Sequence, residues 1–140
     1  MRSAGAIIFF MLSLGDLGGC DYDDPPPACV DIPGSCAPLY EPTFENVYNQ
    51  TLSKKCSVAN AACHSSSAAK GGLVLEGIDE AYDGLVNSVP PRVLPDDPGC
   101  STMAIRVESD DPGYVMPIGA KMSDPERCAI LQWIQDGAKR

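Results

Sequence analysis

The chain carries seven cysteines in 140 residues, and few folds can use that many thiols. In an oxidising compartment thiols pair as disulfides or carry another covalent group, whereas in a reducing one they stay free. Cys20 is treated separately in the next paragraph. Without it the number of cysteines is even, so that each of them can pair with another. These six are Cys29, Cys36, Cys56, Cys63, Cys100 and Cys128.

The N-terminus reads as an export signal. Arg2 supplies a basic start, and the apolar run at residues 4–14 has the length of a signal-peptide core but is too short to span a bilayer. The sequence Leu17-Gly-Gly-Cys20 resembles a bacterial lipobox. We therefore predict a signal peptide at residues 1–19, lipidation of Cys20 and an exported protein that is lipid-anchored to a bacterial membrane, in the periplasm or at the cell surface. An ordinary secretory signal is the alternative.

Residues 20–42 are rich in proline and acidic side chains and show no helical periodicity. This composition is typical of an extended tether. Cys29 and Cys36 lie inside it with six residues between them, and we predict that they close a small disulfide loop. The folded domain is then expected to cover residues 43–140, and the tether would let it swing between partners at the membrane.

Charge and histidine content exclude several classes of protein. The 19 Asp and Glu against 10 Lys and Arg give a formal net charge of −9, which argues against nucleic-acid binding and against direct attraction to an anionic membrane. We expect membrane contact through the lipid anchor only. The single histidine, His64, excludes any site in a monomer that needs two imidazoles.

Apolar periodicity predicts three helices, at residues 43–52, at residues 78–87 and from the Ser123 cap to Gly137, with a weaker one at residues 101–107. No stretch shows sustained alternation, so the expected fold class is all-α, a small helical domain. Residues 57–75 and 108–121 have no periodic face. Long irregular segments in so small a domain indicate that they wrap something other than protein.

Cys56, Cys63 and His64 carry the most chemical information. Covalent haem attachment needs two thiols that add to the porphyrin vinyl groups, and an imidazole directly after the second thiol, where it lies under the iron. Six residues separate Cys56 from Cys63, where the usual motif has two. A disulfide between them is the alternative, and the spacing alone does not choose, because Cys29 and Cys36 share it without a following histidine.

A second iron ligand is predicted at Met116. It lies about 50 residues after His64 in the irregular sequence Gly113-Tyr-Val-Met-Pro-Ile-Gly119. Haem iron held by histidine and methionine has a raised reduction potential and no open position, which suits electron transfer. Met103, in the short helix, and Met122, just before the Ser123 cap, are expected to be packing residues.

The order of these elements resembles a class I c-type cytochrome domain, in a divergent form with a widened haem motif. The resemblance covers about residue 44 to the end. It implies a cytochrome c-like fold with one covalent haem c, thioethers at Cys56 and Cys63, and axial ligands His64 and Met116. It also implies that the helix containing Trp133 packs across the first helix at Phe44.

Cys100 and Cys128 remain, and we predict that they pair. Such a bond would clamp the segment before the short helix to the first turn of the last helix and would close the loop that carries Met116. The chain-entropy model assigns about 3–4 kcal/mol to a loop of this length.

The leading hypothesis is a mono-haem electron carrier without enzymatic activity or small-molecule substrate, passing single electrons between exported or membrane-bound redox proteins. Its acidic surface favours partners with a basic face. The alternative is a haem-free, disulfide-stabilised surface lipoprotein that acts as a binding or structural module, with a Cys56–Cys63 disulfide. A third reading is a haem sensor or gas binder with an exchangeable Met116.

Overall fold

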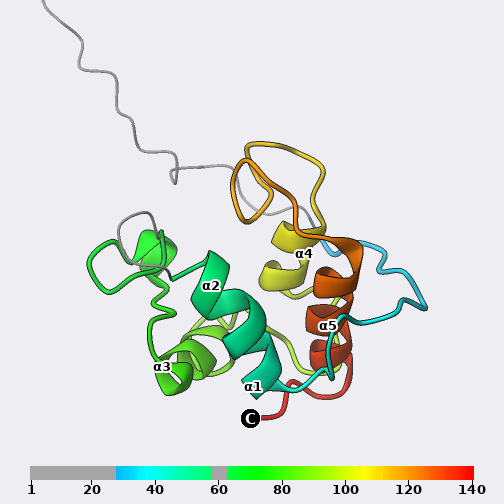
Figure 1. Cartoon of the computed structure of the whole chain (residues 1–140), viewed down its shortest axis with the longest axis horizontal. Coiled ribbons are helices and arrows are strands. Elements are labelled where there is room, and N and C mark those ends of the chain that lie inside the picture. The colour runs from blue at the N-terminus through cyan, green and yellow to red at the C-terminus, as the bar shows by residue number, and fades with distance from the viewer. Residues whose placement is uncertain (1–27, 58–62) are drawn as a thin grey trace, which may run out of the picture.

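The computed structural model describes residues 28–57 and 63–140, and within them it contains helices and no strands (Figure 1). This confirms the expected helical class. The elements in chain order are α1 (Phe44–Asn46), η1 (Val47–Leu52), α2 (Ser53–Lys55), η2 (Lys70–Gly72), α3 (Ile78–Tyr82), η3 (Asp83–Asn87), α4 (Thr102–Glu108) and α5 (Asp124–Gln135). Among the helices described, none has the length and apolarity needed to cross a bilayer.

The first helix is continuous from α1 through η1 to α2, with π-type turns in η1. Thr43 caps it, as predicted, by accepting a hydrogen bond from the Asn46 amide at 3.3 Å. Its apolar face is buried, including Val47 and Leu52. The predicted helix at residues 43–52 is therefore confirmed, and it continues for one more turn to Lys55.

The last helix, α5, begins at the capping box that the sequence predicts. The carboxylate of Glu126 accepts hydrogen bonds from the amide and the hydroxyl of Ser123, at 3.1 and 2.8 Å. The chain leaves the helix through Gly137, whose φ of 90° lies in the left-handed region that favours glycine. The predicted helices at residues 78–87 and 101–107 are also present, as α3 with η3 and as α4.

The core forms where α5 crosses the first helix. The rings of Phe44 and Trp133 lie 5.1 Å apart, and both side chains are almost fully buried. Tyr82 of α3 meets Phe44 edge-on, also at 5.1 Å, and so joins the third helix to the same cluster. The packing of Trp133 against Phe44 that the resemblance implies is confirmed.

Both disulfide pairings predicted from the sequence are wrong. Cys29 pairs with Cys100 and Cys36 pairs with Cys128, so neither the small loop Cys29–Cys36 nor the clamp Cys100–Cys128 is formed. The reason is that residues 28–42 lie against the domain. This brings each N-terminal cysteine next to a thiol that is more than 70 positions away in the sequence.

Residues 28–42, which we call the N-terminal strap, follow the side of the domain formed by α4 and α5 (Figure 1). The Val30 amide donates to the Gly99 carbonyl at 2.9 Å, and the Leu39 amide donates to the Pro125 carbonyl at 2.8 Å. Tyr40 packs against the core. The part of the predicted tether before residue 28, with the signal peptide and Cys20, lies outside the described residues.

Candidate functional site

One cavity of about 400 Å³ lies between the first helix, α4, α5 and the irregular segments. Its size is in the range of small-molecule sites. All four residues predicted to hold haem line it: Cys56, Cys63, His64 and Met116. The rest of its wall is mostly apolar, from Leu52, Leu73, Leu75, Leu85, Met103, Val107, Met122 and Ile130.

His64 is oriented by the main chain. Its Nδ1 lies 3.3 Å from the Leu73 carbonyl oxygen. A carbonyl only accepts hydrogen bonds, so this contact requires the proton on Nδ1 and leaves the lone pair on Nε2. Burial lowers the pKa of His64 below its ordinary value, and the nearby positive charges of Arg92 and Arg106 lower it further, against hydrogen bonds to Leu73 and Lys70 that raise it. A neutral imidazole with its proton on Nδ1 is the form that ligates a metal through Nε2.

The chain around His64 folds into a compact turn. The His64 amide donates to the Cys56 carbonyl at 3.3 Å, and the Leu75 amide donates to the His64 carbonyl at 2.8 Å. Gly71 and Gly72 both have positive φ, 62° and 66°, which the lack of a Cβ permits. This reversal brings the extended backbone that follows, including Leu73, back to the imidazole.

Cys56 and Cys63 differ in state. Cys56 is a free thiol, and burial raises its pKa to about 11, against a small lowering from Lys55. A thiol that stays protonated is a poor nucleophile, which argues against thiolate catalysis at Cys56. Cys63 is joined in a disulfide. Its carbonyl accepts a hydrogen bond from the Lys70 amide at 2.8 Å, so the turn fixes this residue as well.

Met116 reaches the cavity from the irregular segment that follows α4. Its amide donates to the Arg106 carbonyl at 3.1 Å, which ties this segment to the helix. The segment is further held by the Arg106 guanidinium, which lies 4.2 Å from the centre of the Tyr114 ring. Met103 and Met122 also line the cavity, the latter being 4% exposed and part of the core, as a packing residue would be.

Two cavity residues, Arg92 and Arg106, were not singled out from the sequence. Arg92 donates to the Gly84 carbonyl at 2.9 Å and to the Gly71 carbonyl at 2.6 Å, which fixes its guanidinium at the cavity wall. In the sequence these arginines are two of several scattered basic residues with no local pattern. Together with Lys70, which also lines the cavity, they give a mostly apolar wall three positively charged side chains, which suits a flat apolar ligand with anionic groups.

Comparison with protein families bears on this site. Residues 61–117 match the model of the family Planctomycete cytochrome C. The match supports a cytochrome c-like domain. It covers 57 of 140 residues and includes Cys63, His64 and Met116, whereas Cys56 lies before it. No curated protein and no solved structure shows significant similarity to the chain.

The matched segment, residues 61–117, therefore supplies most of the residues that line the cavity, from Cys63 to Met116. The first helix and α5, which complete the wall through Leu52 and Ile130, lie outside the matched range. Geometry adds these two elements to the site, because Phe44 packs both on Trp133 of α5 and on Tyr82 of the matched segment.

Proposed function

We propose that the protein is a mono-haem c-type cytochrome that carries single electrons between other redox proteins. The observation that supports this most is that one apolar cavity gathers the only imidazole, a methionine from a distant segment and two cysteines. Haem iron supplies one-electron redox chemistry when the group is bound. The chain's task is to hold it, to exclude water and to set its potential.

The residues present fit this group. His64 would hold the iron through Nε2, because its Nδ1 lies against the Leu73 carbonyl. Met116 is the proposed second ligand, and its thioether would raise the potential and fill the last open position. Arg92 and Arg106 are the proposed partners of the two propionates, since a guanidinium binds a carboxylate through paired hydrogen bonds.

Covalent attachment is proposed at Cys56 and Cys63. A thioether forms when a thiol adds across a vinyl group, with the sulfur on one carbon and the hydrogen on the other. Cys56 already has the thiol form. Cys63 must first be released from its disulfide by a dithiol reductant. The widened spacing fits this attachment, because the hydrogen bond from His64 to Cys56 keeps the ends of the six-residue gap together.

The proposed location is a bacterial membrane reached by export, with Cys20 lipidated. The strap is fixed at Cys29 by its bond to Cys100, so Cys29 and the residues after it are not available for the 20-residue tether expected from composition. Nine residue steps separate Cys20 from Cys29, a reach of at most about 30 Å. The acidic charge favours redox partners with a basic face, which must then meet the domain close to the membrane.

The disulfide of Cys63 is the observation that favours the second candidate, a haem-free surface lipoprotein acting as a binding or structural module. The Cys56–Cys63 pairing expected for that candidate is wrong, however, because Cys56 is a free thiol. The two candidates differ in what Cys56 and Cys63 carry. In the carrier both sulfurs are consumed by thioethers, and in the haem-free protein neither is.

Expression of the full chain in a bacterium with c-type cytochrome maturation separates these candidates. The proposal expects red protein, haem that stays on the chain after denaturation, and a mass increased by one haem. A His64→Ala variant made in the same host serves as the control and should lose the low-spin spectrum. Colourless protein without added mass would overturn the proposal in favour of the haem-free module. Bound haem without a methionine-to-iron charge-transfer band would favour the sensor or gas binder.

A further inference from the structure

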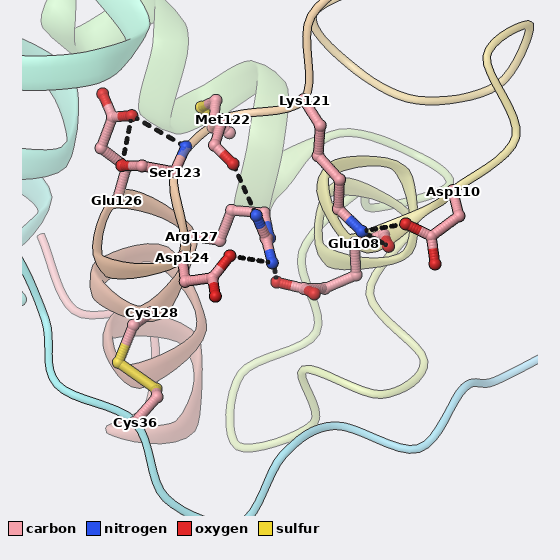
Figure 2. A network of polar contacts seen from close by, with 10 residues as sticks. All are labelled: Cys36, Glu108, Asp110, Lys121, Met122, Ser123, Asp124, Glu126, Arg127 and Cys128. Carbon is pink, nitrogen blue, oxygen red and sulfur yellow. Dashed lines mark hydrogen bonds and ion pairs between the residues drawn. A yellow bond between two sulfur atoms is a disulfide. The ribbon is translucent and has the colours of Figure 1, made fainter.

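The segment that carries Met116 is a loop whose two ends are held together by side chains. It leaves α4 after Glu108 and reaches the cap of α5 at Ser123, so residues 109–121 form the loop proper. We call the charged contacts between its ends the clasp (Figure 2). Because Met116 lies near the middle of this loop, whatever holds the ends also limits where its sulfur can go.

Arg127, on the first turn of α5, is the centre of the clasp. Its Nε lies 2.8 Å from the Glu108 carboxylate, its Nη1 donates to the Met122 carbonyl at 2.5 Å, and its Nη2 lies 2.9 Å from the Asp124 carboxylate. Figure 2 shows the guanidinium lying between these three groups. One side chain thus joins the end of α4 to the chain at both sides of the α5 cap.

The inner and outer parts of the clasp differ in exposure. The side chains of Arg127 and Glu108 are 12% and 18% exposed, so their contact is largely shielded from water. Lys121 makes the outer part: its Nζ lies 2.6 Å from the Asp110 carboxylate, which is 94% exposed, and also donates to the Glu108 carbonyl at 2.6 Å. Exposed ion pairs contribute little to the stability of a fold, whereas removing one partner of a shielded pair destabilises it strongly, because the other charge is left unpaired.

The loop is also attached at its middle. The Met116 amide donates to the Arg106 carbonyl, and Arg106 lies over the ring of Tyr114. This attachment and the clasp are independent, since one uses the body of α4 and the other its last residue.

We propose that Arg127, through Glu108, is a positioning residue that keeps the Met116 loop closed over the cavity. The inference rests on the proposed function for its spectroscopic consequence, because Met116 matters there as an iron ligand. The closure itself is a property of this chain with or without haem, and it is measurable in both forms.

The first test is hydrogen–deuterium exchange on the haem-free full chain, which does not depend on haem binding. Arg127→Met should raise the exchange rate of the amides at residues 110–121 by about tenfold, with the amides of the first helix and of α5 beyond its first turn unchanged. Asp110→Asn removes the exposed pair alone, leaves the hydrogen bond from Lys121 to the Glu108 carbonyl in place and is the matched control, with less than about twofold change. Equal acceleration throughout the chain would overturn the proposal, because Arg127 would then only stabilise the fold.

The second test uses the haem-loaded protein. In Arg127→Met the methionine-to-iron charge-transfer band should be lost at lower guanidinium concentration than the bands that report haem binding, and the two losses should coincide more closely in the wild type. Arg127→Lys keeps the charge and should bring the two losses part of the way back together. A band that follows global unfolding equally in all variants would overturn the proposal. Absence of haem from every variant would instead refute the proposed function, and the exchange experiment would still decide on the clasp.

Discussion

The amide of His64 donates a hydrogen bond to the carbonyl oxygen of Cys56, at 3.3 Å, across the six residues that separate Cys56 from Cys63. The two ends of the widened motif are therefore neighbours in space. In the sequence the spacing is the main departure from the usual haem motif. In the structure the extra residues do not separate Cys56 from the imidazole, because the backbone returns to the end of the first helix before His64.

The assignment of the methionine ligand is tested by paired substitutions. Met116→Ala should abolish the methionine-to-iron charge-transfer band of the haem-loaded protein and change its fold stability little, because the Met116 side chain is only partly buried. Met122→Ala should keep the band but lower the free energy of unfolding by about 2–5 kcal/mol, because this side chain is 4% exposed in the core. Absorption spectra and denaturant titrations measure both. The reverse pattern would assign the ligand to Met122.

Arg92 should influence the reduction potential through its charge. Oxidised haem carries one more positive charge than reduced haem, so a cation at the cavity wall favours the reduced form. Arg92→Met is expected to lower the potential by tens of millivolts, measured by redox titration. Arg92→Lys keeps the charge and should stay close to the wild type. A similar drop in both variants would indicate that Arg92 acts through its hydrogen bonds to Gly71 and Gly84 instead.

The disulfide pairing is directly measurable. Proteolysis of unreduced protein followed by mass spectrometry should yield peptides linked through Cys29–Cys100 and Cys36–Cys128. These bonds span 71 and 92 positions, for which the chain-entropy model gives about 4 kcal/mol each. We expect the double replacement of Cys36 and Cys128 by Ser to lower the free energy of unfolding by roughly that amount. A peptide linking Cys29 to Cys36 would contradict the position of the N-terminal strap.

The capping carboxylate of Glu126 should make stability depend on pH. Partial burial by itself would raise the pKa of Glu126, but hydrogen bonds from Lys55 and Ser123 outweigh it and hold the pKa below its ordinary value of 4.5. The ionised group therefore stabilises the fold fully above pH 4.5, and this contribution is lost as the pH falls through the lowered pKa.

Glu126→Gln is the matching variant, because it keeps the shape of the side chain and removes its charge. At neutral pH it should lower the free energy of unfolding by roughly 0.3–1 kcal/mol, the usual contribution of an anion in the first turn of a helix. The difference from the wild type should vanish in acid. Chemical denaturation at a series of pH values measures it, and a difference independent of pH would show that the charge of Glu126 is unimportant.

Several site residues were predictable because their signals are local. His64 and Cys63 are adjacent in the chain, and Met116 is marked by the proline that follows it. Arg92 and Arg106 were missed for the opposite reason. The residues next to them in the sequence are like those around any surface arginine. Only the packing of η3 and α4 beside the cavity gives these two arginines a role.

By itself the sequence determined the helices, because caps, stops and apolar periodicity act within a few residues of each other. The capping box at Ser123 and the core contact between Phe44 and Trp133 were found where they were expected. The tertiary structure alone decided which cysteines pair. Disulfide formation requires two sulfurs to meet in space, and the strap brings Cys29 and Cys36 to thiols far along the chain through contacts that no local pattern records.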